Sequence, residues 1–155
     1  MNNELEELYR EVILDHSRRP RNFGELPDAT VRVRGDNPAC GDEIDVALKF
    51  GDDGRLEQVK FTGHGCAISQ ASASMMTAKV KNKGRDEASS MLRAFENLIL
   101  GNGSNDSRML GDLQFLAGVR KFPQRVKCAM LAWRALEQAL RQGEGDATVS
   151  TEIEK

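Results

Sequence analysis

The sequence predicts one α+β domain in which helices pack on one face of a small three-stranded antiparallel sheet. Apolar and polar residues alternate in three consecutive segments between residues 31 and 61, the pattern of half-buried strands. From Cys66 onward the apolar residues recur at helical spacing instead. Consecutive strands followed by helices are typical of an α+β domain, and 155 residues are enough for one core.

A first helix is expected at the N-terminus, with Asn2 or Asn3 as its cap. It should end near His16, because Pro20 cannot continue a helix. A loop rich in Arg, Pro and Gly follows over residues 17–28. The apolar residues that form one face of this helix are Leu5, Leu8, Tyr9 and Val12.

Three strands follow, and Asp52-Asp53-Gly54 is the turn between the last two. Leu56 is out of register with the third strand, which predicts a bulge or a late start there. The inward-facing residues are expected to be Val31 and Val33, then Ile44, Val46, Leu48 and Phe50, and last Val59 and Phe61.

Three helical segments are expected after Cys66. The first should stop at Asn82-Lys83-Gly84, and the second should end at residues 101–105. Residues 106–121 predict one or two short helical turns around three leucines, and Pro123 suits the first position of the last helix. Their apolar faces are Ile68, Ala71, Met75 and Ala78, then Leu92, Phe95, Leu98 and Ile99, then Leu110, Leu113 and Leu116, and finally Val126, Met130, Trp133 and Leu140.

The single domain is expected to span residues 1–142, and residues 143–155, which contain little to bury, are predicted to be a flexible C-terminal tail. A net charge of −2 with 30% charged residues gives no general attraction to nucleic acid or to an anionic membrane. No apolar run approaches the ~20 residues that span a bilayer. The acidic N-terminus lacks the features of a targeting signal, so the cytoplasm is the expected location.

An odd number of cysteines in a reducing compartment argues for free, catalytic or metal-bound thiols. Cys40 lies in the stretch Asn37-Pro38-Ala39-Cys40-Gly41-Asp42. In extended backbone, positions i and i+2 point to the same side, so the Cys40 thiolate and the Asp42 carboxylate can meet at one cation. The alternative is a loop cysteine beside a turn-forming aspartate.

Cys66 and Cys128 complete a candidate site with four ligands. Cys66 is expected where a helix begins, and the free N–H groups there lower a thiol pKa toward the reactive thiolate. Cys128 lies early in the last helix, and Arg125 shares its face, where it would stabilise a thiolate or a bound anion. The alternative is that both cysteines are small core residues and Arg125 is solvated.

The histidines are weaker candidates. His64 is close to Cys66 in sequence and is a candidate fourth ligand, but on a strand end it can point away. His16 is expected to be a surface or packing residue. The basic stretch Arg18-Arg19-Pro20-Arg21 is interpreted as a solvated loop, with docking to an acidic partner as the alternative.

Together these residues resemble a known family, the U-type iron–sulfur assembly proteins, over residues 5 to 140. The resemblance implies the fold of that family, described here as SufU/IscU-like. The stretches that carry it are Leu8-Tyr9 to His16 with Pro20-Arg21-Asn22; Asn37-Pro38-Ala39-Cys40-Gly41-Asp42; Gly65-Cys66-Ala67-Ile68-Ser69; Ala71-Ser72-Ala73-Ser74-Met75-Met76; and Arg125-Val126-Lys127-Cys128.

Two features are similar to the SufU branch. Where the IscU scaffold branch has a histidine before its last cysteine, this chain has Lys127, whose ammonium cannot ligate. The chain also has an extra stretch around residues 84 to 105. The resemblance implies a zinc-dependent sulfurtransferase that is co-substrate and activator of a PLP-dependent, SufS-like cysteine desulfurase. Its sulfur would pass to a downstream iron–sulfur assembly scaffold.

Carried over by resemblance, the zinc ligands are Cys40, Asp42, Cys66 and Cys128. Cys40 is the expected persulfide acceptor and Arg125 a supporting catalytic residue. Since a fully ligated thiolate is masked, we expect a desulfurase group, such as a histidine, to replace Cys40 on the metal. One alternative is a scaffold on which an iron–sulfur cluster is assembled, and another is a non-catalytic domain with a structural zinc.

Overall fold

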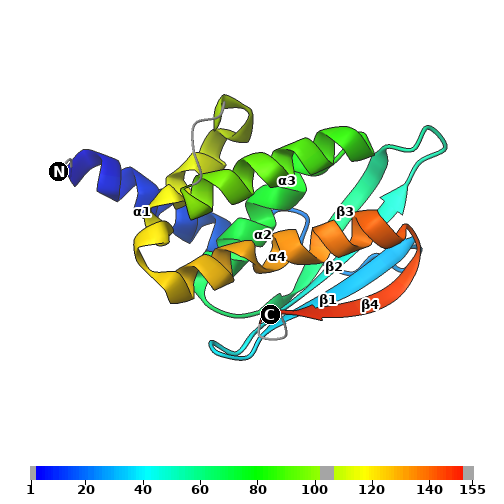
Figure 1. The fold of residues 1–155 in the computed structure, drawn as a ribbon, viewed down its shortest axis with the longest axis horizontal. Helices are drawn as coiled ribbons and strands as arrows, with labels where there is room; N and C mark the ends of the chain where they lie inside the picture. The colour runs from blue at the N-terminus through cyan, green and yellow to red at the C-terminus, as the bar shows by residue number, and fades with distance from the viewer. Residues whose placement is uncertain (1–2, 102–106, 152–155) are drawn as a thin grey trace.

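The computed structural model describes residues 3–101 and 107–151, with side chains described over 10–101 and 109–151. Three strands come between the first two helices, and a fourth strand ends the described chain (Figure 1). In chain order the elements are α1 (Asn3–Arg18), β1 (Val31–Asn37), β2 (Asp42–Phe50), β3 (Leu56–His64), α2 (Ala67–Val80), α3 (Arg85–Leu100), the 3₁₀ segment η1 (Ser107–Lys121), α4 (Pro123–Gln142) and β4 (Gly145–Ser150).

The sheet is mixed and has four strands in the order β3-β2-β1-β4. The pairs β1–β2 and β2–β3 are antiparallel, as predicted, but β4 lies parallel to β1. The α+β class is therefore confirmed, and the prediction of a three-stranded antiparallel sheet is wrong. Within β2–β3, the register shifts beside Phe50, which pairs with Leu56, so the predicted irregularity at Leu56 is present.

The fourth strand forms where a flexible tail is predicted. Gly143, with φ of +81°, ends α4, and the chain turns back so that the Gly145 N–H donates to the Thr30 carbonyl. Residues 145–150 then run along β1, and two of their side chains, Ala147 and Val149, pack against the core. The segment is short and has only a brief strand signal, the alternation of Ala147 and Val149 with polar residues, and pairing with β1 supplies its hydrogen bonds.

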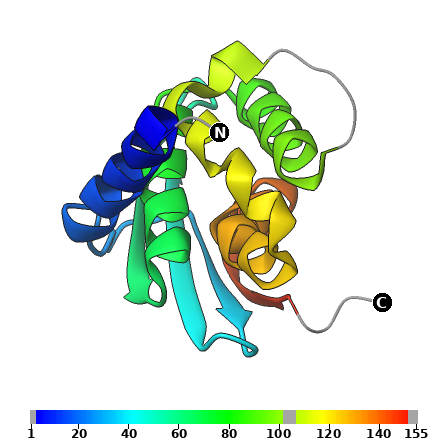
Figure 2. The same ribbon diagram turned by 90° about the vertical axis from the view of Figure 1, so that its left-hand side faces the viewer.

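The helices pack on one face of the sheet, as predicted, in the arrangement seen end-on in Figure 2. Helix α4 lies over β1, β2 and β4, while α2 lies between β3, α4 and α1. Because α2 has neighbours on several sides, residues 71–77 are all buried rather than one stripe. The predicted face of α2 is therefore wrong in part: Ala78 is exposed and Ile68 only half-buried.

The remaining helices agree with the predicted bounds within a few residues. The 3₁₀ segment η1 is kinked at Gly111 and buries its three leucines, as expected for short helical turns. Pro123 is the first residue of α4. The predicted apolar face of α1 includes Leu5, Leu8 and Tyr9, whose side chains lie outside the described residues, while Val12 packs against the core.

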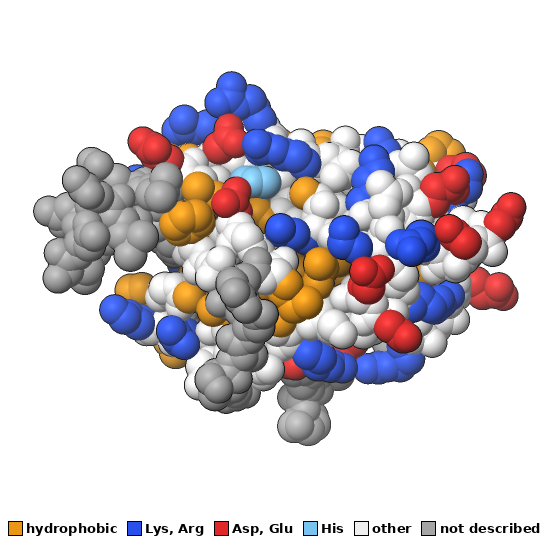
Figure 3. Space-filling view, turned by 90° about the horizontal axis from the view of Figure 1, so that it is seen from above, with side chains coloured by type: hydrophobic (Ala, Val, Ile, Leu, Met, Phe, Trp, Pro, Cys, Tyr) orange, Lys and Arg blue, Asp and Glu red, His pale blue; other side chains and the backbone are white. Residues whose placement is uncertain are grey.

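The face of the molecule in Figure 3 shows no dominant charge. Seen from above, basic and acidic side chains are interspersed over the face that Figure 3 shows, which agrees with the small net charge. Over the described residues, no helix combines the length and apolar character that crossing a membrane requires.

Candidate metal centre

The hairpin between β1 and β2 brings Cys40 and Asp42 to one end of the sheet. Asn37, the last residue of β1, pairs with Asp42, the first residue of β2. The backbone N–H groups of Cys40 and Gly41 both donate to the Asn37 carbonyl, at 3.1 and 2.8 Å, which closes the turn between the strands. The Asp42 side chain is 1% exposed, whereas Cys40 is exposed at the tip of the turn.

Cys66 joins this site from the beginning of α2, where it is the N-cap residue. Its backbone N–H donates to Asp42 Oδ1 at 2.9 Å, so a buried carboxylate binds the positive end of the helix. Gly65 makes this approach possible because a Cβ there would collide with the Asp42 carboxylate and with Ser69 Oγ. The sequence prediction that Cys66 begins a helix is thus confirmed.

Cys128 comes from the second turn of α4 and is fully buried. Its Sγ lies 3.7 Å from Cys40 Sγ. Ligand atoms of Cys40, Asp42 and Cys128 all lie within 4.8 Å of one another. Two sulfurs bound to one tetrahedral zinc at about 2.3 Å would be about 3.8 Å apart. The spacing of the two thiols therefore fits a shared tetrahedral metal.

The fourth predicted ligand, Cys66, does not belong to this close group, but its thiol is hydrogen-bonded to Cys128. That hydrogen bond, with help from the Ser69 backbone N–H, lowers the pKa of Cys66 to about 5 against the opposing effects of burial and the Asp42 charge. The same pairing with Cys66, together with burial and Asp42, raises the pKa of Cys128. Without a metal, the two thiols therefore share one negative charge, and the directions of their pKa shifts favour Cys66 as its carrier.

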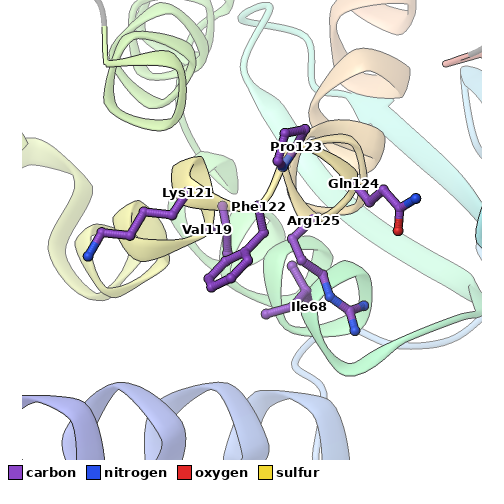
Figure 4. Close-up of a pocket in the computed structure, with 7 residues that line it drawn as sticks. All are labelled: Ile68, Val119, Lys121, Phe122, Pro123, Gln124 and Arg125. Carbon is purple, nitrogen blue, oxygen red and sulfur yellow. The ribbon is translucent and has the colours of Figure 1, made fainter.

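Arg125 lies beside both of these thiols, one turn before Cys128 on α4. The Cys66 thiolate is the main cause that raises the Arg125 pKa, and the guanidinium is hydrogen-bonded to both Cys128 and Cys66. Figure 4 shows its side chain directed toward Ile68 on α2. It also lines a groove of about 790 Å³, whose other lining residues are Ile68, Val119, Lys121, Phe122, Pro123 and Gln124.

Neither histidine joins the site. His64 pairs with Glu43 across the sheet, is 72% exposed, and places Nε2 3.5 Å from Glu43 Oε1. His16 is a packing residue, as one of its two predicted roles has it: its ring is buried and Nδ1 lies 2.7 Å from Ser74 Oγ. In the basic loop after it, Arg19 and Arg21 bind Asp15.

Sequence reasoning did not single out Asn37 as a site residue. Its amide is fully buried, and Nδ2 donates to Asp42 Oδ2 at 3.3 Å and to Cys128 Sγ at 3.7 Å. A signal was present, because Asn37 continues the inward positions of Val31 and Val33 and is polar where a core residue is expected. The third hydrogen-bond partner of the Asn37 amide is Thr151, which lies 114 residues away. No sequence pattern indicates that Thr151 reaches this site.

The donor set suits a metal that accepts sulfur and oxygen. Thiolates favour zinc and iron–sulfur chemistry, and a carboxylate is also a common zinc ligand. Buried Asp42 has both oxygens oriented by hydrogen bonds to Asn37 and Cys66, as is usual for carboxylates that ligate metals. The residues present therefore fit zinc, with Cys40, Asp42 and Cys128 close together and Cys66 adjacent.

Comparison with known proteins finds one family model and several relatives that match most of this chain. Residues 8–129 match the model of the NifU-like N-terminal domain. The chain is 48% identical over 144 residues to the zinc-dependent sulfurtransferase SufU of Bacillus subtilis. The matched region covers 93% of this chain and 97% of that protein. It is also 44% identical over 138 residues to the iron–sulfur cluster assembly scaffold protein IscU of Streptococcus pyogenes, covering 89% and 86% of the two chains.

A solved structure agrees with these sequence matches. A crystal structure from Fervidobacterium islandicum, described as a candidate iron–sulfur cluster assembly scaffold protein for the SUF system, superposes with a TM-score of 0.79. The two sequences are 39% identical, and the match covers 84% of this chain and 94% of that one.

Proposed function

This chain belongs to the family of NifU-like N-terminal domains, and within it we propose that the protein is a zinc-dependent sulfurtransferase of iron–sulfur cluster assembly. It would accept sulfur from the persulfide of a PLP-dependent cysteine desulfurase in the cytoplasm and deliver it to a downstream scaffold. The name and the 48% identity of the Bacillus relative support the zinc-dependent transferase. The cysteine desulfurase as sulfur donor, the scaffold as sulfur recipient and the cytoplasmic location are proposed together with this activity.

We propose that Cys40, Asp42, Cys66 and Cys128 hold the zinc. When bound, zinc keeps its thiolate ligands deprotonated at neutral pH. Cys40 and Asp42 come from the β1–β2 hairpin, Cys66 from the start of α2 and Cys128 from α4. Cys66 lies next to this group, because its backbone N–H binds the Asp42 carboxylate, and we propose that its sulfur joins the other three ligands when zinc binds.

The exposure of Cys40 is the observation that carries the proposed transfer. Cys128 is fully buried and Cys66 is half-buried at a helix N-cap, whereas Cys40 lies exposed on a turn. The Cys40 thiolate would attack the outer sulfur of the donor persulfide. A new S–S bond forms on Cys40, the S–S bond of the donor breaks, and the donor cysteine leaves as a thiolate, so no external oxidant is needed.

Arg125 would assist by binding negative charge at the site. Cys66 and Cys128 both raise the pKa of its guanidinium, so its proposed role is to stabilise thiolates while the acceptor changes partners. An arginine remains charged at any physiological pH, which makes this effect independent of proton exchange.

The test is to locate the transferred sulfur. Zinc-loaded protein is incubated with a cysteine desulfurase and cysteine, and peptides are mapped for an added mass of about 32 Da, one sulfur atom. We expect the adduct on the Cys40 peptide, and no stimulation of desulfurase turnover by Cys40→Ala. An adduct mainly on Cys66 or Cys128 would show that Cys40 is not the acceptor.

A scaffold for cluster assembly is the second candidate, because the Streptococcus relative carries that name at 44% identity. It would use the same thiols. Metal analysis of protein purified without oxygen separates the two functions: near-stoichiometric zinc without visible absorption favours the transferase, and iron with sulfide-dependent absorption favours the scaffold.

A further inference from the structure

The C-terminal strand reaches the metal centre through one chain of hydrogen bonds. Parallel pairing of β4 with β1 ends with Ser150 opposite Asp36, and the Thr151 N–H continues it by donating to the Asp36 carbonyl at 3.0 Å. Thr151 therefore lies beside Asn37. Its hydroxyl donates to Asn37 Oδ1 at 3.0 Å, on the opposite side of the amide from the two ligands that Asn37 contacts.

The hydroxyl of Thr151 donates to the acceptor end of the Asn37 amide. An asparagine amide has one acceptor end and one end with two donors. With Oδ1 held by Thr151, both N–H groups face Asp42 and Cys128. A rotated amide would point its oxygen at a carboxylate and a thiolate, which is repulsive in a fully buried site.

From these contacts we propose that Thr151 is a positioning residue for the metal ligands, acting through Asn37, so that docking of β4 completes the zinc site. The proposal rests on the proposed function in taking zinc as the metal. Hydrogen bonds from outside the ligand set fix the direction of ligands and stabilise coordinated thiolates, and losing one costs about 10- to 100-fold in metal affinity.

The role is specific to one side of β4. Thr148, on β4 three residues before Thr151, is exposed and pairs with Arg34 rather than with a site residue. Thr148→Val therefore makes the same chemical change as Thr151→Val without touching the centre. Thr151→Ser keeps the hydroxyl and is the rescue variant.

The experiment measures zinc affinity by chelator competition in the full chain, with the cobalt(II) absorption spectrum as a second readout of ligand geometry. We expect Thr151→Val to weaken zinc binding about tenfold and to alter the cobalt spectrum. Thr151→Ser and Thr148→Val should match the wild type in both. If Thr151→Val binds zinc like Thr148→Val and has the wild-type spectrum, the proposal is wrong. Thr151→Ala makes the same comparison should the valine variant not fold.

A double-mutant cycle tests the route through Asn37. In an Asn37→Ala background, Thr151→Val should have no further effect on zinc affinity, because the amide that it orients is gone. An equal loss in both backgrounds would mean that Thr151 acts by another path and would overturn the proposal. Wild-type protein that binds neither zinc nor cobalt would refute the proposed function, and this inference with it.

Discussion

The backbone N–H of Cys66 donates a 2.9 Å hydrogen bond to Oδ1 of Asp42, which joins the start of helix α2 to the start of strand β2. The other oxygen of the same buried carboxylate accepts from Asn37. Asp42 therefore has a structural task in addition to its proposed role as a metal ligand, and the two can be separated by working without metal.

Asp42→Ala should destabilise the metal-free protein by about 1–3 kcal/mol, because the buried Asn37 amide and the part-buried Cys66 N–H lose their acceptor. The measurement is urea denaturation in the presence of chelator. Asp45→Ala is the matched control, since Asp45 lies on the same strand and pairs with Arg34 at the surface, where such a pair contributes roughly 0–1 kcal/mol. Equal losses in the two variants would contradict the structural task of Asp42.

Gly65→Ala should displace the Asp42 carboxylate, because the added Cβ collides with it. Gly54→Ala is a suitable comparison: Gly54 has φ of +82° in the β2–β3 turn and nothing within 4 Å of an added Cβ. We expect Gly65→Ala to lose both stability and zinc affinity, and Gly54→Ala to lose only about 1 kcal/mol of stability. Zinc binding that survives Gly65→Ala unchanged would show that the site relaxes around the methyl group.

Metal removal should lower the melting temperature. The proposed ligands come from the β1–β2 hairpin, α2 and α4, so zinc binds only when these elements are assembled. Binding to the folded state alone stabilises it by about 4 kcal/mol when free zinc is a thousandfold above its dissociation constant. Calorimetry before and after verified chelation measures this difference, and superimposable melting curves would argue against a site built from all three elements.

His16 should make stability depend on pH. Burial is the main cause that lowers its pKa below the ordinary value of 6.5, with a contribution from Arg21. The unfolded chain therefore binds the proton more readily, so stability is complete above about pH 6.5 and falls as the pH drops below it. Unfolding free energies of the wild type minus those of His16→Gln isolate this effect. A pH-independent His16 difference would contradict the prediction.

Lys127→His should improve retention of an iron–sulfur cluster, because an imidazole can ligate where a protonated ammonium cannot. Residue 127 precedes the buried Cys128 on α4, next to the candidate centre. The measurement is visible absorption after anaerobic reconstitution, compared with Lys121→His at the end of η1. No gain over that control would place the difference between transferase and scaffold elsewhere in the chain, for example around residues 84 to 105.

The sequence by itself determined the α+β class, the order of the helices and of the first three strands, and three residues that the structure brings together, Cys40, Asp42 and Cys128. These follow from local patterns: period-two alternation, helical spacing, a proline at the first turn of α4, and cysteines in distinctive surroundings. The position of Cys66 at a helix start could be predicted for the same reason, because capping is decided within a few residues.

Only the tertiary structure decided the fourth strand, the burial of α2 and the role of Asn37. Each depends on partners distant in the chain: β4 forms by pairing with β1, α2 is enclosed by β3, α4 and α1, and the Asn37 amide accepts a hydrogen bond from Thr151. The alternation in a segment as short as Gly145–Ser150 is too brief to predict a strand, because strand formation also reflects the neighbours that complete its hydrogen bonds. Local periodicity contains no information about those neighbours, so the hydrogen bonds from Thr151 through Asn37 to the ligands became visible only in the folded chain.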